Sequence, residues 1–80
     1  MPKLPQVSGD RVIDLLKSLG YVKVRQVGSH ARMRQLTSLG EHNITVPRHD
    51  VVAKGTLGDI LNKVALWNNI SKEDLIRHLK

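Results

Sequence analysis

The 80-residue sequence contains no cysteine, so disulfide bonds and thiolate zinc sites are excluded. This absence is compatible with a reducing cytoplasm, where we expect the protein to act. No apolar run approaches the roughly 18 residues of a membrane span. The segment Met1–Pro5 also lacks the apolar stretch of a secretory signal. We therefore expect one small domain over residues 1–80, with no membrane-spanning part.

Acidic residues are missing from the whole stretch between Leu15 and Gly40, although the chain has seven of them. The same stretch carries five cations, namely Lys17, Lys23, Arg25, Arg32 and Arg34. With 13 Lys and Arg in total, the formal net charge is +6. Such a field attracts nucleic acid, an anionic membrane surface or an acidic protein. A membrane surface is disfavoured, because these cations fall on a predicted hairpin rather than on an amphipathic helix.

The spacing of apolar residues predicts the element order α-β-β-β-α-α. The expected elements are a helix that begins after Ser8 and stops at Gly20, strands over about residues 21–27, 30–36 and 43–46, a helix from Thr56 with Asp59 in a capping box, and a short helix after Ser71. The two turns between the strands are expected at Gly28-Ser29 and over residues 37–42. His42, in the second turn, and His78, near the end of the chain, are expected to be exposed.

One apolar stripe on each helix and one apolar face on the sheet favour a two-layer α+β fold, in which the helices cover one face of a three-stranded antiparallel sheet. The expected apolar face consists of Val22, Val24, Ala31, Met33, Ile44 and Val46. The opposite, open face then carries Lys23, Arg25, His30, Arg32, Arg34 and Thr45. A bulge at Gly28 would move His30 to the other face.

The segment Gly28–His30 places a histidine at the start of a strand, directly after a turn and beside cations. Imidazole is the usual general base near neutral pH. RNA carries its own nucleophile, the 2′-hydroxyl next to each phosphodiester. Cleavage by internal attack then requires a base, cations for the charge that develops on phosphorus, and a proton donor for the leaving oxygen. His30 and its neighbouring arginines can supply the base and the cations. Because DNA lacks the 2′-hydroxyl nucleophile, this chemistry predicts RNA and not DNA as the substrate.

Two-metal phosphodiester cleavage would instead require clustered carboxylates. The seven acids are scattered along the chain and none is next to the basic hairpin: Asp10, Asp14, Glu41, Asp50, Asp59, Glu73 and Asp74. No two histidines have the i,i+4 spacing of a helical zinc site. We therefore expect no metal ion and no cofactor.

A second function remains open on the residues alone. His30 could contact a phosphate or a 2′-hydroxyl in a non-catalytic RNA-binding module that uses the same basic hairpin. Ser29 has no oriented acid–base partner in the sequence, so we expect it to form the turn or to donate a hydrogen bond to phosphate.

Three other positions have both a functional and a structural interpretation. His49 is either a second acid/base or substrate contact, or a loop histidine bonded to backbone. Lys54 precedes the predicted second helix, where free backbone N–H groups favour phosphate, although simple capping is the alternative. Trp67 is expected in the core or at a partner interface, so extensive stacking of RNA bases is not expected.

Five motifs in order resemble the HicA/YcfA-like toxin family, the mRNA interferases of HicA–HicB toxin–antitoxin pairs. They are Leu4-Pro5 with Ser8-Gly9, Leu19–Tyr21 followed by Arg25–His30 (the RQxGSH motif), Ile44–His49 (VTVPxH), Lys54–Leu57 (KPGTL) and Ile70–Asp74 (GISREEF). The chain departs from the pattern at Lys54, where proline is usual before Gly55, and at Asn69, where glycine is frequent.

The resemblance implies a double-stranded-RNA-binding-domain-like α-β-β-β-α fold over the single domain. It also implies a type II toxin that cleaves mRNA without a metal ion, arrests translation and is neutralised by a HicB-like antitoxin. The histidine of the family's GSH motif is catalytic and corresponds to His30, and His49 matches a recurrent position. We expect RNA contacts from Lys23, Arg25, Ser29, Arg32, Arg34 and Lys54. An acidic antitoxin could cover the same basic face together with His30.

Overall fold

The computed structural model describes residues 4–79 and has the α+β order predicted from the sequence. Its elements are α1 (Gly9–Ser18), β1 (Val22–Val27), β2 (His30–Thr37), β3 (Gly40–Pro47), α2 (Lys54–Asn68) and α3 (Lys72–Leu79). The three strands form one antiparallel sheet in the order β1-β2-β3. Within residues 4–79, no helix has the length and apolar character needed to cross a membrane.

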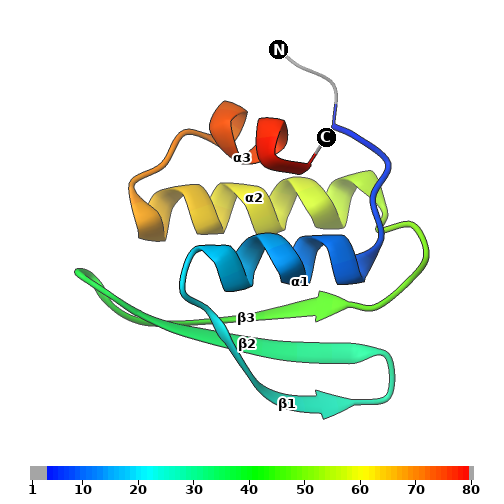
Figure 1. The fold of residues 1–80 in the computed structure, drawn as a ribbon, viewed down its shortest axis with the longest axis horizontal. Helices are drawn as coiled ribbons and strands as arrows, with labels where there is room; N and C mark the ends of the chain where they lie inside the picture. The colour runs from blue at the N-terminus through cyan, green and yellow to red at the C-terminus, as the bar shows by residue number, and fades with distance from the viewer. Residues whose placement is uncertain (1–3, 80) are drawn as a thin grey trace.

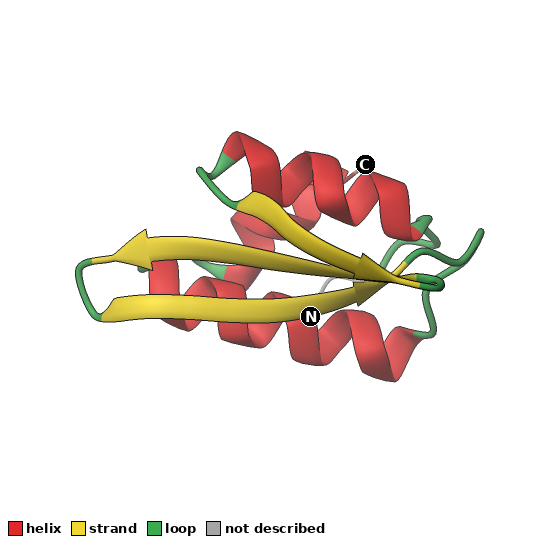
Figure 2. Cartoon of the chain, turned by 90° about the horizontal axis from the view of Figure 1, so that it is seen from below, coloured by secondary structure: helices red, strands yellow, loops and turns green. Residues whose placement is uncertain are grey.

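The helices leave one face of the sheet uncovered. Helices α1 and α2 lie on the other face, and α3 packs on their far side, away from the strands (Figure 1). Figure 2 views the molecule from the strand side, with the strands in front of the helices. The core between sheet and helices contains Ala31, Met33, Ile44 and Val46 from the strands, as predicted. The buried helix residues are Val12, Ile13, Leu15 and Leu16 from α1, Leu57, Ile60, Leu61 and Val64 from α2, and Leu75, Ile76 and Leu79 from α3.

The predicted face of β1 is wrong for its first half. The register shifts between Lys23 and Arg25, which is the signature of a β-bulge. Val22 therefore pairs with Arg34 and lies on the open face, while Lys23 pairs with Met33 on the helix side. Val24, expected in the core, is exposed at the edge. Beyond the bulge the prediction holds, because Arg25 pairs with Arg32 on the open face.

Two predicted helix starts are confirmed and one is wrong. The Ser8 hydroxyl accepts a hydrogen bond from the backbone N–H of Arg11 at 3.1 Å, and the Ser71 hydroxyl accepts one from the N–H of Asp74 at 3.1 Å. Helix α2, in contrast, begins at Lys54 and not at Thr56, and its cap residue Ala53 makes no side-chain bond. It ends at Asn68, and the cap residue Asn69 has a left-handed backbone with φ of 54°, a conformation that asparagine tolerates in place of glycine.

His42 is buried, contrary to the expectation of an exposed turn residue, because β3 begins at Gly40 and includes it. Its ring stacks on Trp67 at 4.8 Å between centroids, and its Nδ1 lies 2.6 Å from the hydroxyl of Tyr21. The side-chain nitrogen of Asn68 donates both to the carbonyl of Val64 at 2.9 Å and to the Tyr21 oxygen at 3.1 Å. The Tyr21 hydroxyl and Nδ1 of His42 therefore share one hydrogen bond, whose direction is set by which ring nitrogen of the imidazole carries the proton.

Burial lowers the pKa of His42 below its ordinary value, and the nearby charge of Lys63 lowers it further. Burial also raises the pKa of Tyr21, with the hydrogen bond from Asn68 acting in the opposite direction. Both shifts favour neutral side chains. The cluster therefore joins β3 to the last turn of α2 through uncharged groups.

Gly9 allows α1 to approach the end of β3 more closely than any other residue could. A Cβ atom at this position would lie 2.0 Å from the carbonyl oxygen of Pro47 and 2.6 Å from Cα of Arg48. The backbone N–H of Gly9 instead donates to the carbonyl of His49 at 2.9 Å. The start of α1 and the loop after β3 are thereby held against each other.

We predict that Gly9→Ala lowers the free energy of unfolding by about 1–3 kcal/mol, because backbone must move to admit the methyl group. Chemical denaturation of the two proteins measures the change. Gly58→Ala is the matched control, since its Cβ would meet only Leu4 Cδ1 at 3.6 Å, an ordinary contact. The control should be neutral or more stable by up to about 1 kcal/mol, as expected for glycine replaced inside a helix. Equal stability of Gly9→Ala and the parent protein would contradict this account.

A second prediction concerns pH. Because the pKa of His42 is lower in the folded than in the unfolded chain, the unfolded chain binds more protons as the pH falls. The contribution of His42 to the free energy of unfolding should be fully present above the pKa of an unfolded histidine, about 6.5. It should be lost as the pH falls through that pKa. Denaturation from pH 8 to pH 5 measures the decline, and His42→Phe should reduce it while keeping a ring against Trp67. His78→Gln should leave the decline in place, because it does not alter His42 or the side chains that bury it.

Candidate nucleic-acid interface

A tight two-residue turn presents His30 on the open face of the sheet. Val27 and His30 are register partners, so Gly28 and Ser29 form the whole connection between β1 and β2. Gly28 has a φ of +58°, which glycine adopts without steric cost and which suits the first position of such a turn. The turn contains no bulge, so His30 lies on the predicted face and is exposed.

A shallow depression of about 210 Å³ adjoins His30 on this face. Its lining consists of Arg25, Val27, His30, Arg32 and Thr45, which come from all three strands. Arg25 and Arg32 are direct register partners across β1 and β2, so their guanidinium groups start from neighbouring positions. The depression therefore combines an imidazole, two cations and a hydroxyl within one concave surface.

Among the residues that the structure describes, the two arginines of this depression form no ion pair with a carboxylate. The ion pairs formed within residues 4–79 involve Arg34, Arg48 and Arg77. Like charges directly opposite each other in a sheet are destabilising, by a few tenths to about 1 kcal/mol. An anion bound between Arg25 and Arg32 would remove this repulsion, and a phosphate has the geometry to accept from both guanidinium groups.

The other cations predicted for this face are placed differently. Arg34 lies on the open face, but it forms an exposed ion pair with Glu41 at 3.4 Å. Lys23 is on the helix side of the sheet, where its Nζ donates to Gln26 at 3.1 Å. Lys54 is exposed at the first residue of α2, and Asp59 lies outside that first turn. The structure thus brings Arg25 and Arg32 together with His30, and separates Lys23 from them.

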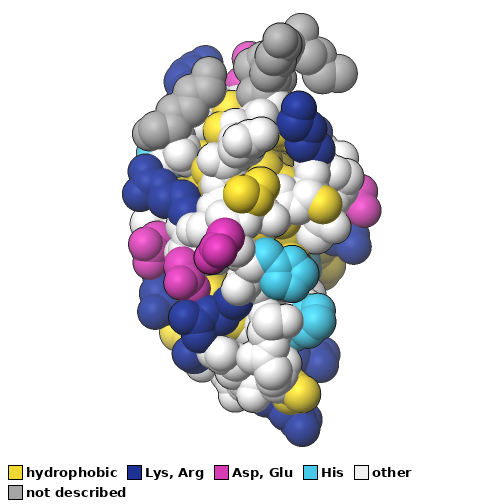
Figure 3. Space-filling model, turned by 90° about the vertical axis from the view of Figure 1, so that its right-hand side faces the viewer, with side chains coloured by type: hydrophobic (Ala, Val, Ile, Leu, Met, Phe, Trp, Pro, Cys, Tyr) yellow, Lys and Arg dark blue, Asp and Glu magenta, His cyan; other side chains and the backbone are white. Residues whose placement is uncertain are grey.

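The second candidate histidine belongs to the same end of the molecule as the turn. His30 pairs with Pro47, and His49 follows two residues later in the loop after β3. The backbone N–H of Arg48 donates to the carbonyl of Ser29, which ties this loop to the turn. Figure 3 views this end, where histidine side chains lie next to one another at the surface. His49 is exposed, and its carbonyl accepts the bond from Gly9.

Sequence reasoning did not identify a polar network behind the turn. The guanidinium of Arg48 bonds to the carboxylate of Asp10 at 2.7 Å and to Gln26 at 3.0 Å. The hydrogen bond from Arg48 holds the pKa of Asp10 below its ordinary value, and Asp10 in turn raises the pKa of Arg48. The sequence contains one indication of this network: Gln26 is a polar residue on the side of β1 that faces the helices, so it needs a polar partner there.

Within residues 4–79, no three His, Asp or Glu side chains come together in a group that could hold a metal ion. The chemical groups that do converge are one imidazole and two guanidinium groups. An imidazole can accept or donate a proton near neutral pH, and guanidinium groups bind phosphate and stabilise negative charge on it. The depression therefore gathers chemical groups of the kinds that bind a phosphodiester and transfer a proton.

Comparison with known proteins gives one positive result. The sequence model of the family described as the HicA toxin of bacterial toxin–antitoxin systems matches residues 9–66. No curated protein and no solved structure matches the chain. The matched segment covers more than half of the 80 residues and includes the turn, His30, the depression and His49. The chain belongs to the HicA toxin family.

Proposed function

We propose that this toxin is a metal-independent endoribonuclease that cleaves mRNA in the cytoplasm and thereby arrests translation. One observation carries the proposal: an exposed histidine shares a depression with two cross-strand arginines that have no carboxylate partner within residues 4–79. Membership of a toxin family supplies the biological setting, since a toxin must damage an essential process of its host.

The cleavage would proceed by internal attack. His30 removes the proton from a ribose 2′-hydroxyl, and the oxygen attacks the adjacent phosphorus. The bond from phosphorus to the 5′-oxygen breaks, which leaves a 2′,3′-cyclic phosphate on one product and a 5′-hydroxyl on the other. Arg25 and Arg32 stabilise the charge on the phosphoryl oxygens. His49 is the leading candidate to protonate the leaving oxygen, because its loop is tied to the turn that carries His30.

RNA contacts are assigned by position. Arg25 and Arg32 line the depression, Ser29 is exposed in the turn, and Arg34 continues the row on β2. Lys54 begins α2 at the end of the molecule that carries the turn (Figure 1). Lys23 lies on the opposite side of the sheet, so it does not contact the scissile phosphate in this proposal.

A toxin of this family implies a cognate antitoxin. We propose a HicB-like protein that presents acidic side chains to the open sheet face. The unpaired arginines would attract it for the same reason that they attract RNA. Such a partner would cover His30 and the depression together and so exclude the substrate.

The first test is cleavage of RNA in the presence of EDTA. We predict that His30→Ala slows cleavage by at least about 100-fold, the lower range for loss of a general acid–base group. Gel analysis of a labelled RNA measures the rate, and a substrate with a single 2′-deoxy nucleotide at the cut site should resist cleavage. His78→Ala is the matched control, because this exposed histidine lies on α3. If the parent protein and His30→Ala bind RNA and both leave it intact, the protein is a non-catalytic RNA-binding module.

A further prediction concerns the two unpaired arginines. Arg25→Gln and Arg32→Gln should each weaken RNA binding and lower the slope of log K against log salt by about one, as expected for one lost phosphate contact. Binding titrations at several salt concentrations measure the slope. Arg77→Gln is the control, since this arginine is paired with Asp74 on α3. An unchanged slope in both variants would show that the RNA phosphates do not occupy the depression.

A further inference from the structure

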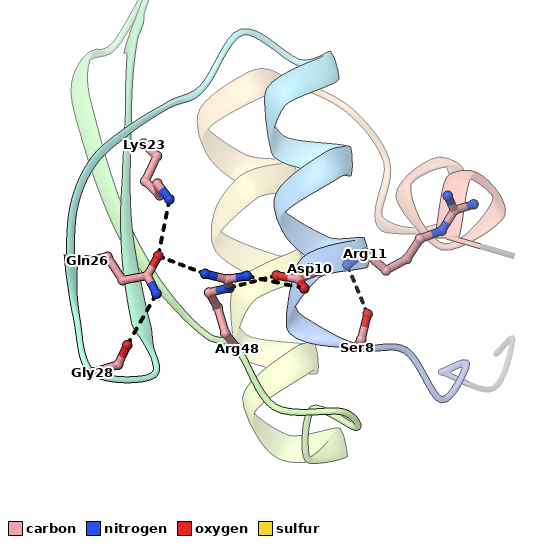
Figure 4. Close-up of polar contacts among 7 residues, drawn as sticks. All are labelled: Ser8, Asp10, Arg11, Lys23, Gln26, Gly28 and Arg48. Carbon is pink, nitrogen blue, oxygen red and sulfur yellow. Dashed lines mark hydrogen bonds and ion pairs between the residues drawn. The ribbon is translucent and has the colours of Figure 1, made fainter.

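Gln26 is the centre of a hydrogen-bond network that reaches the turn before His30. Its side-chain oxygen accepts from Nζ of Lys23 at 3.1 Å and from Nη1 of Arg48 at 3.0 Å (Figure 4). Its side-chain nitrogen donates to the carbonyl of Gly28 at 3.3 Å. Two cationic donors thus fix the orientation of the amide, and the amide holds one carbonyl of the turn.

Arg48 holds the other carbonyl of the turn and connects both to α1. Its backbone N–H donates to the carbonyl of Ser29. Its Nε and Nη2 donate to the two carboxylate oxygens of Asp10 at 2.7 and 3.4 Å, while Nη1 reaches Gln26. The guanidinium of Arg48 therefore makes a bidentate contact with Asp10 and a further hydrogen bond to Gln26. The planar guanidinium, with its five N–H donors, is suited to this arrangement.

The network lies behind the turn with respect to the candidate site. Gln26 is the register partner of Ala31, whose side chain is buried under the helices, so Gln26 projects to the helix side. His30 belongs to the open side, with Arg25 and Arg32. The network therefore fixes the backbone that carries His30 from the face away from the substrate.

We propose that Gln26 and Arg48, anchored by Asp10, are positioning residues for His30. The proposal rests on the ribonuclease function proposed above. With both turn carbonyls bound, the backbone at His30 has one orientation, and the imidazole is held beside the depression. Without these bonds a two-residue turn that contains a glycine can change its backbone angles, and the imidazole moves relative to the bound phosphate. A displacement of about 1 Å in such a group can cost 100-fold in rate.

The size of the expected stability change separates this positioning role from a purely structural one. The carboxyl and guanidinium side chains of the Asp10–Arg48 pair are 64% and 36% exposed. An exposed ion pair of this kind contributes little to stability. A structural role therefore predicts a small loss of stability and no selective effect on cleavage. A positioning role predicts a selective loss of the cleavage rate in a protein that remains folded and still binds RNA.

The test compares the single-turnover cleavage rate with the affinity for an RNA that has 2′-deoxy at the cut site. Gln26→Leu removes all three bonds of the amide, and we expect the rate to fall about 10- to 100-fold while the dissociation constant changes less than about twofold. Gln26→Glu keeps an acceptor for Arg48 but faces the carbonyl of Gly28 with an oxygen, so it should lose rate without losing the cation contacts. Arg48→Lys cannot bond both Asp10 and Gln26 in this geometry, and should be intermediate.

Asp10→Asn and Asp74→Asn form the matched pair. Both carboxylates lie in the first turn of a helix, and each forms an exposed ion pair with an arginine. We expect Asp10→Asn to lower the rate and Asp74→Asn to leave it unchanged, at similar melting temperatures. Equal rates in the two variants would overturn the proposal. A parallel loss of rate and affinity in the Arg48 and Gln26 variants would also overturn it, because these residues would then act as RNA ligands.

An independent measurement keeps the proposal testable if the parent protein does not cleave RNA. Backbone ¹⁵N relaxation reports the order of the Ser29 and His30 amides on the picosecond-to-nanosecond timescale. Gln26→Leu should lower their order parameters while leaving those of α2 unchanged. Unchanged order in the turn would refute the positioning role. Absence of cleavage by the parent protein, with reduced order in the variant, would instead refute the ribonuclease function and leave the role of the network in place.

Discussion

The close approach of α1 to the end of β3 is the constraint on which the arrangement of the site depends. Gly9 is the first residue of α1, and its missing side chain admits the backbone of Pro47 and Arg48. This contact places Asp10 within reach of Arg48 and gives the carbonyl of His49 its donor. Arg48 then bonds the β1–β2 turn through its backbone. Three segments far apart in the sequence are thus joined at one corner of the molecule: the start of α1, the end of β3 with the loop that follows it, and the β1–β2 turn.

Much of the fold could be predicted because the apolar residues of this chain follow regular periods. Alternation in β2 and β3 placed Ala31, Met33 and Val46 in the core correctly, and it placed His30 on the open face. The same rule failed in the first half of β1, since a bulge adds one residue and reverses every side chain before it. No local residue pattern marks that bulge. The edge position of β1 tolerates it, because only one side of the strand is paired.

The candidate site was predictable only in the part that lies along one strand. His30 and Arg32 follow from the alternation of β2, and Arg25 is brought opposite Arg32 by the short turn. Arg48 and His42 could not be assigned in the same way, because their partners are distant in the sequence. The contact between Arg48 and Asp10 spans 38 residues, and Tyr21 and His42 are 21 apart. Such pairs depend on how the elements pack, and packing is not visible in the periodicity of one segment.

The bulge in β1 also affects whether a further strand can pair with the free edge of the sheet. Three valines of β1, Val22, Val24 and Val27, are exposed on an outer strand, a composition that would favour strand-to-strand association. An added strand needs an uninterrupted row of N–H and C=O groups, and the shift between Lys23 and Arg25 interrupts that row. Lys23 and Arg25, which flank this shift, also repel the same residues of a second copy. The bulge therefore makes the exposed edge of β1 a poorer template for an added strand.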